Sequence, residues 1–162
     1  MTRIGFYAGS FDPPTLGHVE LLERALALVD RLVVGVGRNV EKRSWLDVEV
    51  RLELLRAVAP EGVEVVAFEG LAVEAARSVG STLLIRGVRG PEDVNSELTM
   101  ARANRRLAPD IETLLIVGSP DTAHVSSRLV REVHASGGDV THFVSAPVAA
   151  VLAERVTSTR SS

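Results

Sequence analysis

Cysteine is absent from the 162 residues of the sequence. This absence excludes disulfide bonds, zinc–thiolate centres and catalysis by a thiol. No apolar run approaches the ~20 residues that a membrane-spanning helix needs, and no segment has the composition of a signal peptide. We therefore expect a cytoplasmic protein that has no membrane partner.

Lysine is nearly absent, because Lys42 is the only lysine among 18 basic residues. The net charge is −3, which gives no general attraction to nucleic acid, so no nucleic-acid partner is expected. The position of a single lysine can be chance. It is also what a site requires when it needs a compact point charge rather than the planar fork of arginine. Its place after the second expected strand favours this second interpretation.

Apolar strand-like runs alternate with helical patterns along the chain. This alternation predicts a Rossmann-like, doubly wound α/β fold, in which five parallel strands are covered by helices on both faces. The length suits a single domain over residues 1–162, with a frayed polar tail over 157–162. The expected strands are Arg3–Ala8, Arg31–Val36, Val63–Phe68, Thr82–Ile85 and Thr113–Val117, and the expected helices are Leu16–Val29, Asp47–Val58, Ala72–Val79, Asp93–Leu107, Ser127–Ala135 and Pro147–Arg155.

Polar residues and glycines mark the ends of these elements. Asp47 and Ser126 stand where a side-chain oxygen can cap a helix. Gly80 and Gly137 lie just past helix ends, where a left-handed residue is favoured. The segment Gly35–Gly37 lacks the third glycine of a dinucleotide-binding fingerprint, and we interpret it as a turn at the end of a strand.

The most informative segment is Gly9–His18, which joins a buried strand to a helix. Exposed backbone N–H groups and the positive end of the helix dipole make such a junction a binding site for anions. His18 stands in the first helical turn, where its ring N–H can point at a phosphate. The plainer alternative is an ordinary strand–helix loop that carries a surface histidine.

Every candidate motif follows the carboxyl end of an expected strand, which is the edge where open α/β sheets bind ligands. This edge gathers arginines, the lysine and serine hydroxyls, which are groups that bind phosphate. It offers no nucleophile–base pair, no H-E-x-x-H sequence and no full Walker sequence. Transfer of a phosphorus group depends mainly on positioning and charge stabilisation, so the edge suits that chemistry. The motifs are Gly9–His18, Asn39–Arg43, Gly70–Ala72, Arg86–Arg89 and Gly118–Ser127.

Several motifs resemble one enzyme family. The sequence G-S-F-D-P-P-T-L-G-H over residues 9–18 resembles the G-S-F-D-P-x-T-x-G-H signature of the phosphopantetheine adenylyltransferases, a T-x-G-H form of the nucleotidyltransferase H-x-G-H motif. Ile85–Arg89 is similar to the family's I-R-G-L-R element, and Val125–Glu132 to its I-S-S-S-L-V-K-E element. Gly138–Val140 matches a stretch near the family's C-terminus. The resemblance keeps order and spacing from about residue 3 to residue 154.

The resemblance implies that the chain transfers the adenylyl group of ATP to 4′-phosphopantetheine, giving dephospho-coenzyme A and pyrophosphate in coenzyme A biosynthesis. The implied mechanism is direct in-line displacement, with Mg²⁺ carried by ATP rather than by a protein metal site. A homohexamer and feedback inhibition by coenzyme A are also implied. Two alternatives stay open. One is another nucleotidyltransferase, such as a nicotinamide-mononucleotide adenylyltransferase or a cytidylyltransferase, and the other is a catalytically silent protein that binds nucleotide or coenzyme A.

The same resemblance assigns roles to individual residues. Catalysis is expected from His18, which would donate to the α-phosphate, and from Lys42, Ser10 and Arg89. The acceptor is expected to bind Ser10, Lys42, Leu71, Ala72 and Arg86. ATP is expected to bind Ser10, Phe11, His18, Gly87, Val88, Arg89, Glu97, Thr122, Ala123, His124, Val125, Ser126, Ser127 and Arg128.

The chain departs from the family pattern on the nucleotide side. Arg128 replaces the third hydroxyl of the serine element, and it either adds a phosphate ligand or forms an outward ion pair. Ser96 and Asn95 stand where the family has an aromatic and an acidic residue. Thr122–His124 replaces an aromatic-Ser-Phe run. These changes bear on nucleotide affinity, whereas the acceptor side matches the pattern.

Several residues also have a purely structural interpretation. Asp12 is suited to an Asx bond in its own turn, and Ser126 to a helix cap alone. Arg86 and Arg89 are possible solvated charges at the start of a helix, and Glu97 a possible surface residue. Surface or packing positions without a chemical role are expected for His134, His142 and Trp45, and the residues alone give the same interpretation for His124, to which only the resemblance assigns a role.

Replacing the single lysine tests its interpretation. We expect Lys42→Arg to reduce adenylyl transfer, because a planar fork does not replace a point charge in a tight site. Steady-state kinetics with the acceptor would measure the loss. Wild-type activity in this variant would show that the site does not need a lysine at position 42, and that the position of the single lysine is chance.

Overall fold

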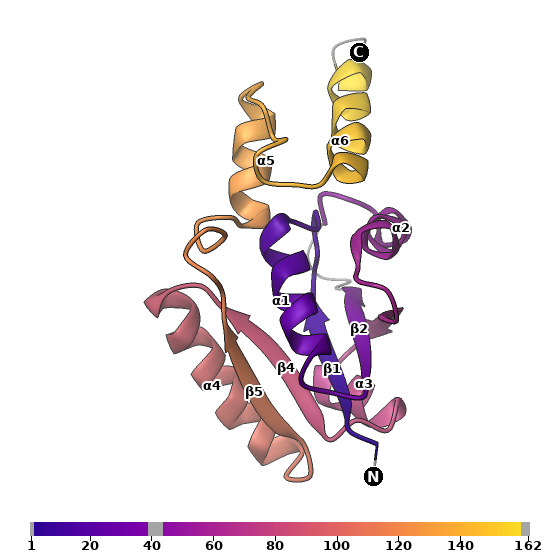
Figure 1. Cartoon of the computed structure of the whole chain (residues 1–162), viewed down its shortest axis with the longest axis vertical. Helices are drawn as coiled ribbons and strands as arrows, with labels where there is room; N and C mark the ends of the chain where they lie inside the picture. Colours follow the sequence, from indigo (N-terminus) through magenta and orange to yellow (C-terminus); the bar gives the residue numbers. More distant parts are fainter. Residues whose placement is uncertain (1, 39–43, 160–162) are drawn as a thin grey trace.

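The computed structural model describes residues 2–38 and 44–159. Within them, five strands form one parallel sheet in the order β3-β2-β1-β4-β5 (Figure 1). The predicted doubly wound fold is therefore confirmed. The strands are β1 (Ile4–Gly9), β2 (Arg31–Arg38), β3 (Glu64–Glu69), β4 (Leu83–Val88) and β5 (Glu112–Val117). The helices are α1 (Leu16–Leu26), α2 (Val48–Val58), α3 (Ala72–Ser78), α4 (Pro91–Leu107), α5 (Ser127–Ala135) and α6 (Ala146–Thr159).

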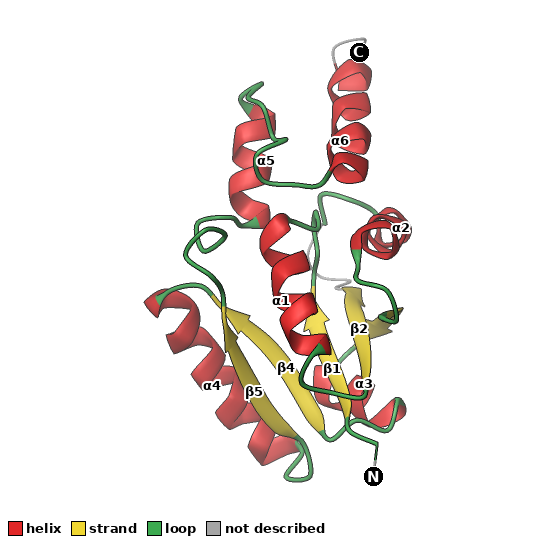
Figure 2. Cartoon of the chain, in the orientation of Figure 1, coloured by secondary structure: helices red, strands yellow, loops and turns green. Residues whose placement is uncertain are grey.

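Helices cover both faces of the sheet (Figure 2). α1 and α2 pack on one face through an apolar cluster that includes Leu22 and Leu55. α3 packs on the other face, where Ala76 meets Phe6 of β1, and α4 lies along β4 and β5 on that side. α5 and α6 stand beyond the carboxyl ends of the strands, joined to α2 by a third cluster that includes Leu152. None of the helices in the described residues combines the length and the apolar composition needed to span a bilayer.

The order of the strands reverses between β1 and β4. These two strands are neighbours in the sheet, although β2 and β3 separate them in the chain. The connections after β1 and β4 therefore leave toward opposite sides, and a crevice forms at their carboxyl ends. The predicted motifs after β1 and β4 border this crevice.

The end of β4 differs from the prediction. The ladder with β5 continues until Val88 pairs with Val117. Arg86 and Gly87 therefore lie on the strand, not in the loop after it. This position fixes the Arg86 backbone in the sheet, which is more rigid than a loop.

Several helices also have ends that differ from the prediction, and α1 ends at Leu26 rather than Val29. α4 begins at Pro91 rather than Asp93, because proline is well tolerated at the first helical position, where its missing N–H would have no partner. α6 continues to Thr159 rather than ending at Arg155. The backbone over 157–159 is therefore helical where a frayed tail was expected.

The predicted helix caps were correct at three of four positions. The Ser126 hydroxyl accepts a hydrogen bond from the Leu129 N–H at 3.1 Å, which confirms its cap. Gly80 and Gly137 have φ angles of 76° and 75°, as left-handed residues do. Asp47 precedes α2, but its side chain makes no cap hydrogen bond, so that prediction is wrong. Its carboxylate is exposed to water, and only its backbone carbonyl accepts a helical N–H.

The segment Gly35–Gly37 is not a turn, because both glycines lie inside β2. The rings of Phe6 and Phe68 explain why residue 35 is a glycine. Phe6 and Phe68 meet edge to face with centroids 5.7 Å apart. A Cβ on Gly35 would overlap the Phe6 ring and lie 2.8 Å from Phe68 Cδ1. The glycine therefore makes room for the aromatic pair.

An alanine substitution tests this explanation. Gly35→Ala should lower the free energy of unfolding by about 1–3 kcal/mol, because the added methyl overpacks the core. Gly37→Ala is the matched control, since a Cβ there would lie 3.6 Å from Phe68, an ordinary contact. Urea denaturation would measure both variants. Equal stability of the two would contradict the account.

Candidate functional site

A cavity of about 800 Å³ opens at the carboxyl ends of β1 and β4, beside the first turns of α1 and α5. Most of the site residues that were predicted from the sequence line this cavity. Its lining includes Ser10, Phe11, His18, Leu71, Ala72, Arg86, Gly87, Arg89, Glu97, Val125, Ser126, Ser127 and Arg128.

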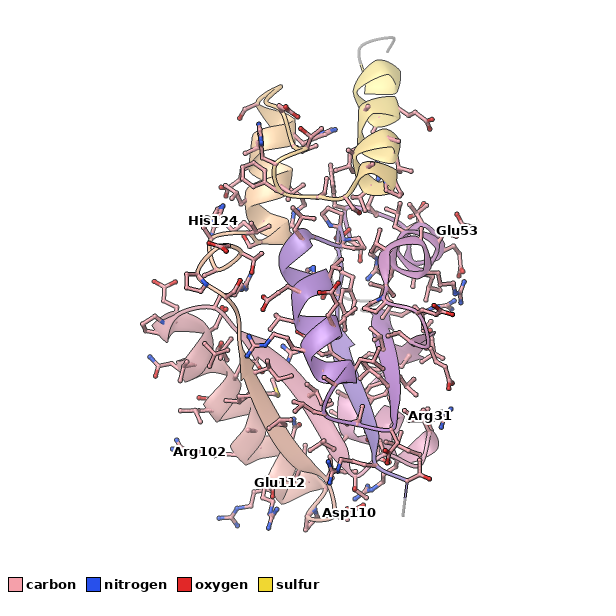
Figure 3. The ribbon with its side chains drawn as sticks, in the orientation of Figure 1. Arg31, Glu53, Arg102, Asp110, Glu112 and His124 are labelled. Atoms are coloured by element: carbon pink, nitrogen blue, oxygen red, sulfur yellow. The ribbon has the colours of Figure 1, made fainter. Side chains whose placement is uncertain are left out.

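Other nominated residues do not line this cavity. Lys42 lies outside the described residues. Val88 is buried, with 3% of its surface exposed. His124 is exposed on the loop before α5, with its ring 6.2 Å from that of Phe143 (Figure 3). Thr122 and Ala123 belong to the same loop and are also absent from the lining.

The loop between β1 and α1 lines the cavity and contains a residue, Phe11, with an unusual backbone conformation. Phe11 adopts a left-handed backbone conformation, with φ of 49°, and its side chain is buried. Its ring lies 4.9 Å from the His18 ring and presses against Gly9, where a Cβ would lie 2.8 Å from Phe11 Cε2. The absence of a side chain at Gly9 therefore makes room for the Phe11 ring, and the Phe11 ring packs against the His18 ring.

Hydrogen bonds fix the orientation of the His18 ring. The Thr15 N–H donates to His18 Nδ1 at 3.0 Å, and the His18 N–H donates to Thr15 Oγ1 at 3.3 Å, a reciprocal capping box. A backbone N–H can only donate, so Nδ1 must carry a lone pair. The ring proton therefore sits on Nε2, and His18, as part of the cavity lining, offers an N–H donor.

The surroundings also keep this ring neutral. Burial, followed by the positive charges of Arg89 and Arg86, lowers the pKa of His18 from 6.5 to about 4. A neutral imidazole donates a hydrogen bond at pH 7 without adding its own charge. The alternative of an ordinary surface histidine is therefore wrong.

Carboxylates of α4 hold two of the cavity arginines, Arg86 and Arg89. Glu97 accepts from Arg86 Nε at 2.8 Å and Nη2 at 2.6 Å, and Arg86 also donates to the Ala8 carbonyl. Asp93 accepts from Arg89 Nε at 2.8 Å. The hydrogen bonds that Arg86 donates to Glu97 raise the pKa of Arg86 above its ordinary value. Neither arginine is a solvated charge, and Glu97 is not a surface residue, so those alternatives are wrong.

The loop before α5 is tied to the body of the protein by its polar contacts. Glu20 of α1 accepts from the Thr122 hydroxyl at 2.9 Å and from the Ser119 N–H at 3.2 Å. Arg89 donates to the Val125 carbonyl at 3.2 Å. The loop before α5 is therefore held from two sides, by Glu20 of α1 and by Arg89 after β4.

The first turn of α5 supplies further polar groups. The Ser127 hydroxyl donates to the Pro13 carbonyl at 2.8 Å, whereas the Ser126 hydroxyl accepts the cap hydrogen bond and keeps its own O–H. Arg128 forms the outward ion pair, with Nε 2.9 Å from Glu132 and 82% of its side chain exposed. The start of α5 thus combines the positive end of a helix dipole with a Ser126 O–H that has no acceptor among the described residues.

Sequence reasoning missed several residues around the cavity. Asn104 is the clearest, because it lines the cavity with only 7% of its surface exposed. The sequence pattern that could have identified Asn104 is its spacing from Glu97 along the helix. Glu97, Met100 and Asn104 recur at three- and four-residue steps, share one face of α4, and all line the cavity.

Asp12 has a different role from the expected Asx bond. Its carboxylate accepts from the Trp45 N–H and the Leu46 N–H, both at 2.7 Å. Asp12 therefore ties its loop to the segment before α2. Trp45 packs edge to face on His134, as expected of a packing residue. His134 bonds the Leu152 carbonyl, away from the cavity.

Metal ligands are not clustered in the part of the chain that the structure describes. No group of three or more histidine, aspartate or glutamate side chains is arranged to hold an ion there. Both carboxylates of the cavity, Asp93 and Glu97, are engaged by arginines. The site is therefore a set of donors and cations for an anionic ligand.

Comparisons with known proteins agree with this architecture. A family model described as cytidylyltransferase-like matches residues 6–133. A crystal structure from Vibrio parahaemolyticus, provisionally assigned as a nicotinate-nucleotide adenylyltransferase, superposes with a TM-score of 0.68 at 16% identity, covering 94% of this chain and 99% of the other. The fold and the site thus define a nucleotidyltransferase of the cytidylyltransferase-like family.

Relatives with curated names identify the particular family of nucleotidyltransferases to which the chain belongs. The chain is 43% identical over 160 residues to the phosphopantetheine adenylyltransferase of Dinoroseobacter shibae, covering 94% of each chain. It is 38% identical over 161 residues to that of Lachnoclostridium phytofermentans, covering 98% of this chain and 99% of the relative. The chain therefore belongs to the phosphopantetheine adenylyltransferase family, which confirms the resemblance of its motifs.

The protonation state of His18 can be measured directly. We expect NMR titration of the ring nitrogens to give a neutral Nε2–H tautomer at pH 7 and a midpoint near pH 4, with the His18→Ala spectrum identifying the signals. Because the folded state binds this proton less readily than the unfolded state, the His18 contribution to stability is full above pH 6.5 and is lost as the pH falls toward 4. A midpoint near 6.5, or a proton on Nδ1 at pH 7, would contradict the geometry.

Proposed function

We propose that the protein transfers the adenylyl group of ATP to the phosphate of 4′-phosphopantetheine. An oxygen of that phosphate forms a bond to the α-phosphorus of ATP, and the bond from the α-phosphorus to the β-bridging oxygen breaks. Dephospho-coenzyme A and pyrophosphate are the products. The attacking phosphate is already ionised at pH 7, so the reaction needs no general base.

The observation that carries this proposal is the neutral, oriented His18 in the same cavity as Arg86 and Arg89. A fixed N–H donor stabilises charge that builds on the α-phosphate oxygens without having to reorganise. A protein that only binds nucleotide has no need of such a donor. The geometry therefore favours catalysis over the silent-binder alternative.

The nucleotide is assigned to the wall formed by the end of β4 and the start of α5. Arg89 and the Ser126 hydroxyl supply donors there, and the α5 dipole favours the β- and γ-phosphates. The Gly17 N–H is the remaining first-turn amide of α1, because the described residues provide it with no acceptor. This amide faces the phosphates together with the His18 ring.

The acceptor is assigned to the opposite wall. Ser10 and Arg86, with Lys42, would hold its phosphate, and Leu71 and Ala72 would line the pantetheine arm. Asn104 lines the cavity with a side-chain amide for which the described residues give no partner. Amide groups of the pantetheine arm can exchange hydrogen bonds with it.

Mg²⁺ enters this scheme as part of the MgATP substrate. Phosphate oxygens and water supply most ligands of such an ion, so a dedicated carboxylate cage is unnecessary. The wider proposal also includes a single catalytic domain, a cytoplasmic location, feedback inhibition by coenzyme A and a homohexamer. Exposed apolar side chains of α4 outside the cavity lining, namely Leu98 and Leu107, support an assembly.

Product identification tests the reaction. The protein incubated with ATP, Mg²⁺ and 4′-phosphopantetheine should give dephospho-coenzyme A by mass spectrometry, with an equal amount of pyrophosphate. Nicotinamide mononucleotide as acceptor, and CTP in place of ATP, should give little product. Turnover only with those replacements, or ATP binding without turnover, would overturn the proposal.

Removing the His18 ring separates catalysis from binding. His18→Ala should lower kcat on the order of 100–1000-fold and change the Kd for ATP far less. His142→Ala is the matched control, because that side chain is 76% exposed and lies outside the cavity. Equal damage to kcat and to ATP binding would assign His18 to binding alone.

A further inference from the structure

Arg51 of α2 is a buried cation that lies outside the cavity lining, with only 2% of its surface exposed. Its guanidinium donates to the Ser10 carbonyl at 2.8 Å and to the Gly37 carbonyl at 3.1 Å, both from Nη1. Nε donates to the Leu46 carbonyl at 3.1 Å, and Nη2 to the Ser44 hydroxyl at 3.3 Å. One side chain thus joins the loop after β1, the end of β2 and the segment before α2.

The bond to Ser10 fixes a peptide that borders the cavity. A trans peptide is planar, with its C=O and N–H pointing in opposite directions. The Ser10 carbonyl points at buried Arg51, so the Phe11 N–H points the other way. The described residues give this N–H no acceptor, and both Ser10 and Phe11 line the cavity.

The conformation of this peptide needs such support. Phe11 has φ of 49°, a left-handed conformation that a residue with a side chain rarely adopts. Conformations of this kind persist where the surroundings over-determine them. Arg51 supplies part of that constraint, and its rigid fork reaches several carbonyls at once, which a lysine cannot do.

We propose that Arg51 is a positioning residue for the transfer reaction, and that it holds the Ser10–Phe11 peptide with its N–H toward the reacting phosphates. This proposal rests on the proposed function. The Phe11 N–H then acts with the His18 ring as a second fixed donor. Arg51 does not touch the substrate, and its effect passes through the backbone of Ser10 and Phe11.

Substitutions of Arg51 distinguish positioning from folding. Arg51→Gln should lower kcat about 100-fold, because small displacements of catalytic groups cost rates of that order. Arg51→Lys keeps the charge and should give an intermediate loss. The Kd for MgATP should change less than about threefold, since most nucleotide contacts lie on the other wall. Arg56→Gln and Arg56→Lys are matched controls on the exposed face of α2 and should match wild type.

The outcomes separate this proposal from the proposed function. An inactive wild-type protein would overturn the proposed function. An active wild type with equal kcat in Arg51→Gln would overturn only the positioning role. If both Arg51 variants fail to fold, or lose MgATP binding in proportion to kcat, Arg51 is a structural residue and the proposal is wrong. A crystal structure of Arg51→Lys should also show a changed φ at Phe11, and an unchanged φ would count against the proposal.

Discussion

The hydrogen bond from the Thr15 N–H to His18 Nδ1 is the interaction on which the site depends. It requires a lone pair on Nδ1, so it decides both the tautomer and the charge of the ring. It also forms half of the capping box that starts α1. The stability of the helix start and the readiness of the Nε2–H donor are therefore consequences of the same bond. Protonation of Nδ1 would break this hydrogen bond and with it half of the capping box, although Nε2 would keep its proton.

The backbone around this bond is held by side chains from beyond the loop. Carbonyls of the loop accept from α5, where Arg131 bonds Asp12 at 2.6 Å and Ser127 bonds Pro13 at 2.8 Å. The Leu16 N–H donates to the Phe143 carbonyl at 3.0 Å. These directed hydrogen bonds add to the apolar packing of Phe11, which is buried in the core. This arrangement explains why α5 and the segment before α6 pack beyond the edge of the sheet.

Charge in the cavity is likewise arranged before any substrate arrives. Glu97 and Asp93 hold the two arginines through charge-assisted bonds, which are stronger than neutral ones. Burial would raise the pKa of Asp93, but the hydrogen bonds and charge of Arg89 lower it below its usual value. The pairs keep the guanidinium groups in place. Burial, followed by the positive charges of these guanidinium groups, lowers the pKa of His18 and keeps its ring neutral. Preorganisation of this kind reduces the reorganisation that the transition state would otherwise require.

The fold was largely predictable from the sequence, because β-α alternation and the strand-end motifs depend on local periodicity. The contributions of Glu97 and Asn104 were harder to see, since they depend on which face of α4 turns to the sheet. Gly35 was misread because its neighbours Phe6 and Phe68 come from other strands. Arg51 gave no signal at all, because a buried arginine in an amphipathic helix looks like a solvated one. Contacts of this kind join residues far apart in the chain, so local sequence patterns do not predict them.

The central claim is that the two substrates react directly in one cavity, with fixed donors and no covalent enzyme intermediate. The stereochemistry at the α-phosphorus tests it most directly. The reaction would be run with a single diastereomer of adenosine 5′-O-(1-thiotriphosphate), and the product configuration determined by phosphorus NMR. A single in-line displacement predicts inversion. Retention would show two displacements through an adenylylated protein and would contradict the account.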